Sequence, residues 1–244
     1  LRDALWSRFL GAERWGIKGG IRRSRRHAVE RYLDVLRERG IDVRGAEPRG
    51  VLRDEEIKSA RTLLRERGVD PEGMIVGIHP GGGWPYKLWG AEGFARLAEI
   101  FAAELGARVL LFCGPGEEEL AERVESLSSA GVIRFEGLPL RTVAALISLC
   151  SLYVGNDTGT THLAAAVGTP TVAIFGPTDH IRSGPYGEHT ALVLPRLRLK
   201  CMPCHPWGKP GGCGEGVCPA LKSITPRDVF GVCTGLLRRM QKLA

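Results

Sequence analysis

The chain has 244 residues, of which 43% are hydrophobic and 25% charged, a composition typical of a globular protein that buries one substantial core. Its 33 glycines and 15 prolines lie at the ends of apolar runs, which excludes a low-complexity chain. No apolar run approaches the roughly 20 residues that span a bilayer, and residues 1–20 lack the pattern of a secretory signal. We therefore expect a cytoplasmic protein without a transmembrane segment.

The net charge of +7 has a local source near the start of the chain. The basic residues there are Lys18, Arg22, Arg23, Arg25 and Arg26. Such a cluster attracts phosphates on nucleic acids, membranes or acidic glycolipids, although a solvated helix start explains it equally well. No aromatic residues interleave with the cluster, so a nucleic-acid partner is disfavoured.

The first predicted elements are two helices and a linker. Apolar residues recur at helical spacing from Ser24 to Arg39, and Gly40 follows as a stop. Residues 41–52 are polar and irregular, as a linker between two lobes would be. A second helix is predicted to run to about Arg67, with Asp54 as its N-cap.

From residue 74 onward, strands and helices alternate strictly. The predicted strands are 74–79, 108–113, 132–135, 152–154 and 171–175, and the predicted helices are 91–105, 117–128, 140–149 and 160–167. The strands are continuous apolar runs, as a parallel sheet covered on both faces requires. We therefore expect an α/β fold with a doubly wound, Rossmann-like parallel sheet, in which ligands bind beyond the carboxyl ends of the strands.

The loop after the first of these strands passes through Gly82 and Gly83 to Lys87. Glycines let backbone amides approach an anion closely, and a lysine supplies positive charge for a phosphate. No Lys-Ser or Lys-Thr pair follows at P-loop spacing, and a tight strand-to-helix connection would also explain the glycines.

Two further loops should line the same edge of the sheet. Residues 155–162 join a strand to a helix whose free amides could hold a diphosphate, with His162 in its first turn. Asp157 or Thr158 could cap that helix instead. In the loop before residue 119, Glu117 or Glu118 could accept hydrogen bonds from a ribose, and we take Glu118 as the candidate. Acidic residues in a first helical turn also interact favourably with the helix dipole, which would explain both residues without a ligand.

Three motifs together resemble glycosyltransferase family 9, which contains the lipopolysaccharide heptosyltransferases. They are the glycine-rich loop with Lys87 and Trp89, the run Asp157-Thr-Gly-Thr-Thr-His162, and the run Gly168-Thr-Pro-Thr-Val-Ala-Ile-Phe-Gly-Pro-Thr178. The resemblance covers roughly residue 51 to the end of the chain.

The resemblance implies a two-lobed GT-B enzyme that transfers heptose from ADP-heptose, with inversion and without a cofactor, to a lipopolysaccharide core acceptor at the inner membrane surface. Residues 1–50 would be the tail of the acceptor-binding lobe and a linker. Residues 51–244 would be the donor-binding domain, with a Cys-rich loop at 200–218 and a closing helix at 226–242. The donor contacts that it implies are Gly82, Gly83, Lys87, Asp157, Thr158, Gly159 and His162.

Many relatives carry hydroxyl residues where Gly82 and Gly83 stand, so only the backbone can serve there. The chain begins with Leu1 instead of methionine, which suggests a fragment. The general base would lie near the start of the first lobe, for which we find no counterpart. We therefore expect the chain to bind donor without transferring sugar.

Four cysteines form the pattern C-x2-C-x8-C-x4-C at Cys201, Cys204, Cys213 and Cys218. Four soft ligands in a short loop could hold a tetrahedral zinc, although the spacing of the second pair is loose. Disulfides and plain thiols are equally open. The competing functions are a nucleotide-sugar epimerase of similar build and a zinc-dependent nucleic-acid-binding module.

Overall fold

A computed structural model describes residues 26–204 and 218–241. Its helices are α2 (Ala28–Arg37), α3 (Asp54–Glu66), α4 (Ala91–Leu105), α5 (Glu118–Leu127), α6 (Leu140–Ser148), α7 (Gly159–Ala166), α8 (His180–Ser183) and α9 (Pro226–Gln241). Its strands are β1 (Ile75–His79), β2 (Arg108–Cys113), β3 (Ile133–Glu136), β4 (Leu152–Asn156), β5 (Thr171–Ile174) and β6 (Thr190–Val193). Short 3-10 turns lie at Pro85–Lys87 and Leu221–Ser223.

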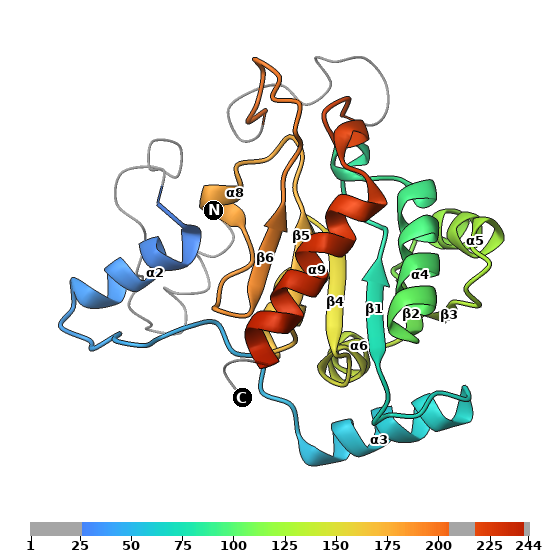
Figure 1. The fold of residues 1–244 in the computed structure, drawn as a ribbon. Coiled ribbons are helices and arrows are strands. Elements are labelled where there is room, and N and C mark those ends of the chain that lie inside the picture. Colours follow the sequence, from blue (N-terminus) through green and yellow to red (C-terminus); the bar gives the residue numbers. More distant parts are fainter. Residues whose placement is uncertain (1–25, 205–217, 242–244) are drawn as a thin grey trace.

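The six strands form one parallel sheet in the order β3-β2-β1-β4-β5-β6, which confirms the predicted doubly wound fold (Figure 1). The chain builds outward from β1 to β3 and then returns to place β4 on the other side of β1. The loops that follow β1 and β4 therefore separate at a topological switch point, where sheets of this kind bind ligands.

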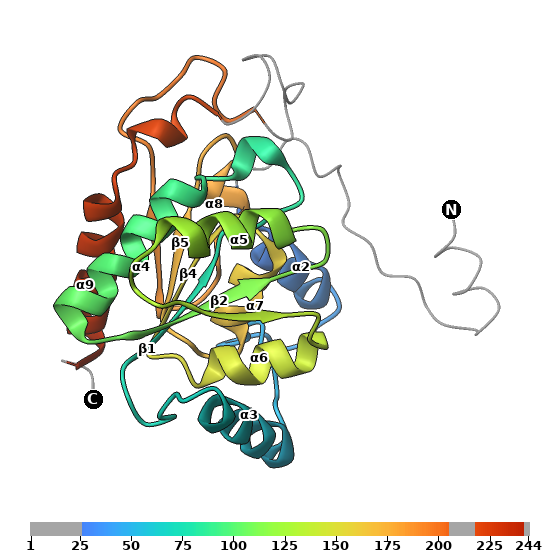
Figure 2. The same cartoon turned by 90° about the vertical axis from the view of Figure 1, so that its right-hand side faces the viewer.

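Helices cover both faces of the sheet, as the apolar strands require (Figure 2). On one face α4, α5 and α9 pack against Val76 and Ile78 of β1. On the other face α3, α6 and α7 pack against Ile75 and Tyr153. The core of β1, β4 and β5 is buried on both sides, which fixes the positions of the loops at their carboxyl ends.

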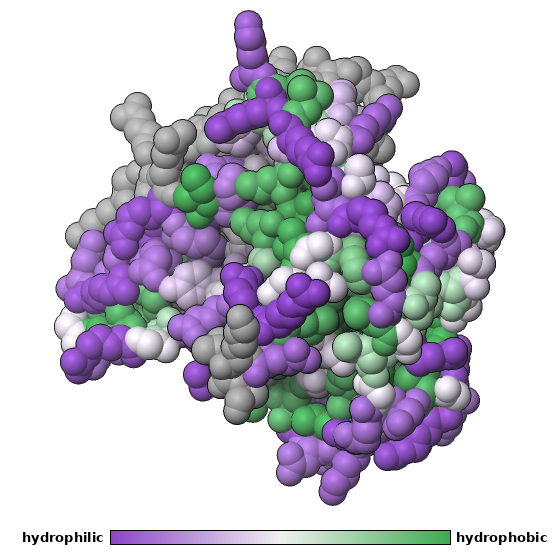
Figure 3. Space-filling model, in the orientation of Figure 1, coloured by the Kyte–Doolittle hydropathy of each residue, from purple (hydrophilic) through white to green (hydrophobic). Residues whose placement is uncertain are grey.

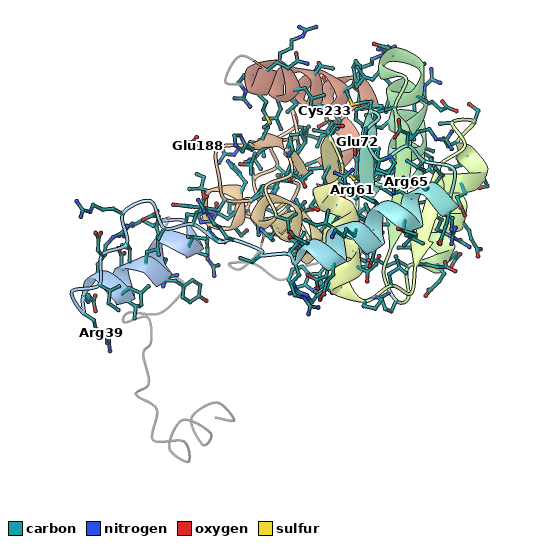
Figure 4. All side chains as sticks on the ribbon, turned by 90° about the horizontal axis from the view of Figure 1, so that it is seen from below. Arg39, Arg61, Arg65, Glu72, Glu188 and Cys233 are labelled. Carbon is teal, nitrogen blue, oxygen red and sulfur yellow. The ribbon has the colours of Figure 1, made fainter. Side chains whose placement is uncertain are left out.

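The helix α3 shows the amphipathic pattern in detail. Ala60 and Leu64 are buried against the sheet layer, while Arg61 and Arg65 project outward from the helix (Figure 4). The prediction of Asp54 as its N-cap was wrong, because the cap is Arg53, whose backbone N–H donates to Glu56 Oε2 at 2.8 Å. Asp54 lies instead in the first turn, where its charge still favours the helix dipole.

The sequence did not predict β6 and α8. Each has four residues, and β6 is only partly buried, so neither carries a readable periodicity. Both lie on the side of the sheet next to α2, where His27 Nε2 contacts the Gly184 carbonyl at 2.8 Å. In the orientation of Figure 1, apolar residues reach the surface near the middle of the molecule, while polar residues predominate over α2 and α3 (Figure 3).

Within the described ranges, no helix combines the length and apolar character needed to cross a membrane.

Candidate nucleotide-sugar site

Asn156, at the end of β4, fixes the glycine-rich loop at the switch point. Its side chain is fully buried, and Nδ2 donates to the carbonyls of Pro80 and Gly81 at 2.7 and 3.2 Å. Its Oδ1 accepts from the backbone N–H of Trp89 at 3.2 Å. One amide therefore holds both ends of the loop that carries Lys87.

Trp89 closes the same loop from the core side. Its indole Nε1 donates to the Ile224 carbonyl at 3.0 Å, and its ring packs edge-on against Phe94 with centroids 5.2 Å apart. Trp89 is 8% exposed, so it secures the loop to the core and leaves Lys87 to face the site.

Lys87 and Asp157 form an ion pair at the start of α7. Lys87 Nζ lies 2.7 Å from Asp157 Oδ2 and 5.5 Å from the centre of the Trp84 ring. His162 Nε2 lies 3.9 Å from the other oxygen of Asp157, beyond hydrogen-bond distance, and its side chain is 43% exposed. The three predicted residues therefore meet, with the carboxylate between two groups that can carry positive charge.

Burial tends to raise the pKa of the Asp157 carboxyl, but its neighbours reverse that effect. The imidazole of His162 and the ammonium of Lys87 hold the pKa of Asp157 below its usual range, with help from the buried Thr178. Asp157 is therefore ionised at neutral pH, and an ionised carboxylate only accepts hydrogen bonds.

A second cluster lies behind the glycine-rich loop, where the ends of β1, β2 and β4 meet. His79 is 4% exposed. Its Nε2 lies 2.8 Å from Glu117 Oε2, and its Nδ1 lies 3.0 Å from Thr160 Oγ1. Glu117 also accepts from the Gly114 backbone N–H at 2.8 Å.

Burial tends to raise the pKa of Glu117, and the hydrogen bonds from His79 and from the backbone outweigh it, so the pKa lies below the usual range. Space for this carboxylate comes from a glycine, because a Cβ atom on Gly81 would overlap it. The acid that turns inward is thus Glu117. Glu118, the predicted ribose ligand, is exposed and accepts from the Gly116 backbone N–H at 3.1 Å.

The remaining predicted contacts border the same space. A Cβ atom on Gly82 would lie 2.9 Å from Thr158 Cγ2, which places the glycine-rich loop against the start of α7, whereas one on Gly83 would meet nothing within 4 Å. Thr158 is the N-cap of α7 but makes no side-chain cap. Its hydroxyl lies 3.0 Å from that of Thr160, and Gly159 is exposed at the first helical position.

The cysteine loop lies only partly within the described residues. Cys201 is exposed, Cys204 is half-buried, and Cys218 is buried in the core that includes Ile224, while Cys213 lies outside the described residues. In residues 26–204 and 218–241, no three His, Cys, Asp or Glu side chains group as metal ligands. The zinc assignment therefore stays a prediction, as does the role of residues 18–25, which also lie outside the description.

Sequence reasoning missed Asn156, His79 and the choice of Glu117. Asn156 directly precedes the Asp157 motif and is the chain's one asparagine, which was a usable signal. His79 and Glu117 are 38 positions apart, and only the adjacency of β1 and β2 brings them together.

A doubly wound sheet with a lysine, free helix amides and an acid at its switch point is the architecture that α/β domains commonly use to bind nucleotides. The model of glycosyltransferase family 9, the heptosyltransferase family, matches residues 19–211, and the chain belongs to this family. The matches support neither the epimerase nor the nucleic-acid-binding interpretation.

Three relatives illustrate the match. Lipooligosaccharide heptosyltransferase 2 of Campylobacter jejuni is 30% identical over 175 residues, which are 67% of this chain and 51% of the relative. A family 9 glycosyltransferase from Veillonella parvula superposes with a TM-score of 0.78 at 26% identity, covering 91% of this chain and 62% of that one. ADP-heptose LPS heptosyltransferase II of E. coli superposes with a TM-score of 0.64 at 25% identity, and the match covers 80% of this chain and 54% of that one. The chain spans about half the length of the curated relatives that it matches.

Proposed function

We propose that this chain is the donor-binding half of a glycosyltransferase that transfers heptose from ADP-heptose to a lipopolysaccharide core. The observation that carries the proposal is the meeting of Lys87, Asp157 and the start of α7 at the switch point. The names of the relatives supply the sugar and the acceptor, since they are lipooligosaccharide and lipopolysaccharide heptosyltransferases.

The donor diphosphate would lie between Lys87 and the amides at the start of α7. The ammonium and the positive end of the helix dipole both favour an anion there. During transfer, negative charge grows on the leaving diphosphate, so the same groups would stabilise the transition state. Backbone amides of Gly82 and Gly83 would complete this cradle.

Asp157 would serve the sugar and not the phosphates, because an ionised carboxylate repels a diphosphate and accepts hydrogen bonds from hydroxyls. Its ion pair with Lys87 keeps the ammonium oriented until the donor arrives. On the opposite side of the site, Glu117 or Glu118 would accept from ribose hydroxyls.

The proposal extends to the organisation of the enzyme. Residues 1–50 would be the tail of the acceptor-binding lobe and 51–244 the donor domain, and the general base would belong to the acceptor lobe. The enzyme would work without a cofactor in the cytoplasm, at the inner membrane surface where its acceptor lies. A structural zinc held by the cysteine loop is a separate part of the proposal.

A nucleotide panel tests the proposal directly. Thermal-shift and calorimetric titrations of the chain with ADP, UDP, GDP and ADP-heptose should show selective stabilisation by the two adenine ligands, with ADP-heptose the stronger. A ligand present at 100 times its Kd stabilises the folded state by about 2.7 kcal/mol, which is readily measured. No response to any of the four would contradict the assignment.

A further inference from the structure

His79, to which the proposed function gives no role, lies in the middle of a buried series of hydrogen bonds that runs from Glu117 to the hydroxyls at the start of α7. This series joins the loop after β2 to the start of α7, the two places where the donor would be held. Successive heavy-atom distances are 2.8 Å from Glu117 to His79, 3.0 Å from His79 to Thr160 and 3.0 Å from Thr160 to Thr158.

The direction of this series follows from counting hydrogens. The ionised Glu117 only accepts, so Nε2 of His79 carries a hydrogen and donates to it. In a neutral imidazole, Nδ1 is then an acceptor and takes the one hydroxyl hydrogen of Thr160. Thr158 can then donate to Thr160 at 3.0 Å or to the buried Thr161 at 3.4 Å, and in either case its hydrogen points inward.

A second proton on His79 reverses the direction. Nδ1–H then donates to Thr160 Oγ1, and Thr160 no longer spends its hydrogen on the imidazole. One hydroxyl hydrogen, from Thr160 or Thr158, becomes free to point out of the start of α7. Thr161 spends its own hydrogen on the Asn156 carbonyl at 2.7 Å. Its oxygen lies 3.4 Å from Thr158 Oγ1, and as a neutral, more distant acceptor it binds the freed hydrogen less strongly than a diphosphate would.

We propose that His79 is a positioning residue that takes up a proton when a diphosphate binds at the start of α7, and so turns the Thr160 and Thr158 hydroxyls into donors to that anion. The inference rests on the proposed donor site. It assigns a role to a side chain that is buried behind the glycine-rich loop and reaches the ligand only through two threonines.

The other ionisable groups around His79 allow this uptake. Glu117 faces it from the start of α5 and compensates a positive imidazolium. Burial raises the pKa of Tyr153 on β4 and, to about 11, that of Cys113 on β2, so both stay neutral. Glu118 is exposed on α5. On the ligand side, Lys87 pairs with Asp157, and His162 lies beside the same carboxylate.

The test measures ADP binding by calorimetry between pH 6 and 8 in two buffers with different enthalpies of ionisation. The wild-type protein is compared with two site variants. His79→Gln keeps a neutral N–H donor and cannot carry a second proton. Thr160→Val breaks the series of hydrogen bonds while keeping the histidine. His189→Gln, an exposed histidine outside the site, is the matched control.

We expect wild type and His189→Gln to gain affinity over His79→Gln as pH falls, by up to about tenfold per pH unit, the limit for one linked proton. The dependence of their binding enthalpy on the buffer should exceed that of both site variants. The ionisation of ADP itself is common to all four proteins. The differences between them therefore report only on the proton taken up through the series of hydrogen bonds at His79.

Superimposable pH profiles for wild type and the site variants, with ADP bound by all, would overturn the inference and leave the donor site standing. If wild type binds ADP at no pH, the proposed function fails and the inference fails with it. If His79→Gln melts below the assay temperature, the comparison rests on Thr160→Val, because Thr160 is only half-buried and its replacement disturbs the fold less.

Discussion

Asp157 is the residue whose charge state matters most to the site, because it is 7% exposed and ionised beside Lys87. Its lowered pKa means that the folded chain gains stability from this carboxylate at any pH above its ordinary value of 3.8. That contribution is lost as the pH falls through the lower, folded pKa.

Asp157→Asn should therefore destabilise the chain near neutral pH by roughly 1–3 kcal/mol, since Lys87 loses its partly buried partner. The difference in the free energy of unfolding between wild type and variant should narrow as the pH is lowered from 6 to 3. Urea unfolding at several pH values measures it. Asp42→Asn, in an exposed pair with Arg44, is the control and should change stability by less than about 1 kcal/mol. A gap that widens toward low pH would contradict the assigned pKa direction.

How far the site could be predicted also depends on single residues. Lys87, Asp157 and His162 were predicted because each stands in a short motif at the end of an apolar run, and the structure brings them together. Glu117 and Glu118 are adjacent, and only the fold decides which one turns inward toward His79. Their assignment as ribose ligands stays a prediction.

Among the elements, the glycine-rich loop depends on two buried side chains, Asn156 and Trp89. Asn156 makes its three hydrogen bonds to residues 80, 81 and 89, and all lie in buried surroundings. The loop has no strand pairing of its own between β1 and α4, so its shape rests on this amide and on Trp89.

Asn156→Ala should cost roughly 2–4 kcal/mol of stability, because two carbonyls and one N–H lose their buried partner. It should also weaken ADP binding by displacing Lys87. Chemical unfolding and calorimetry measure the two effects. Thr62→Ala, whose hydroxyl contacts only the Lys58 carbonyl of its own helix, should leave both nearly unchanged. Equal stability of Asn156→Ala and Thr62→Ala would show that the loop is supported elsewhere.

The elements themselves were largely predictable. The bounds of α4 and β2 follow from long apolar patterns with clear stops, such as Gly106 after α4, where a left-handed φ of 61° favours glycine. The strand β6 and helix α8 were missed because four residues give too little pattern. The true cap of α3, Arg53, could not be told from Asp54, because a backbone hydrogen bond to Glu56 decides it.

For the whole molecule, strand order is the property that turns separate motifs into one site. The order β3-β2-β1-β4-β5-β6 brings the loops after β1, β2 and β4 to neighbouring positions at one edge. The sequence predicted a doubly wound sheet from strict alternation, and family membership follows from the match over residues 19–211. The division into a donor domain and the tail of an acceptor lobe stays a prediction.

The central claim is that a diphosphate binds between Lys87 and the start of α7, and calorimetric titration of ADP into wild type, Lys87→Met and Lys58→Met tests it most directly. Lys58 is an exposed lysine on α3, remote from the switch point. We predict that Lys87→Met weakens ADP binding by roughly 10- to 100-fold, the loss of about 1.5–3 kcal/mol from a charge-assisted contact, while Lys58→Met matches wild type. Equal affinity in all three proteins would place the nucleotide elsewhere and contradict the account.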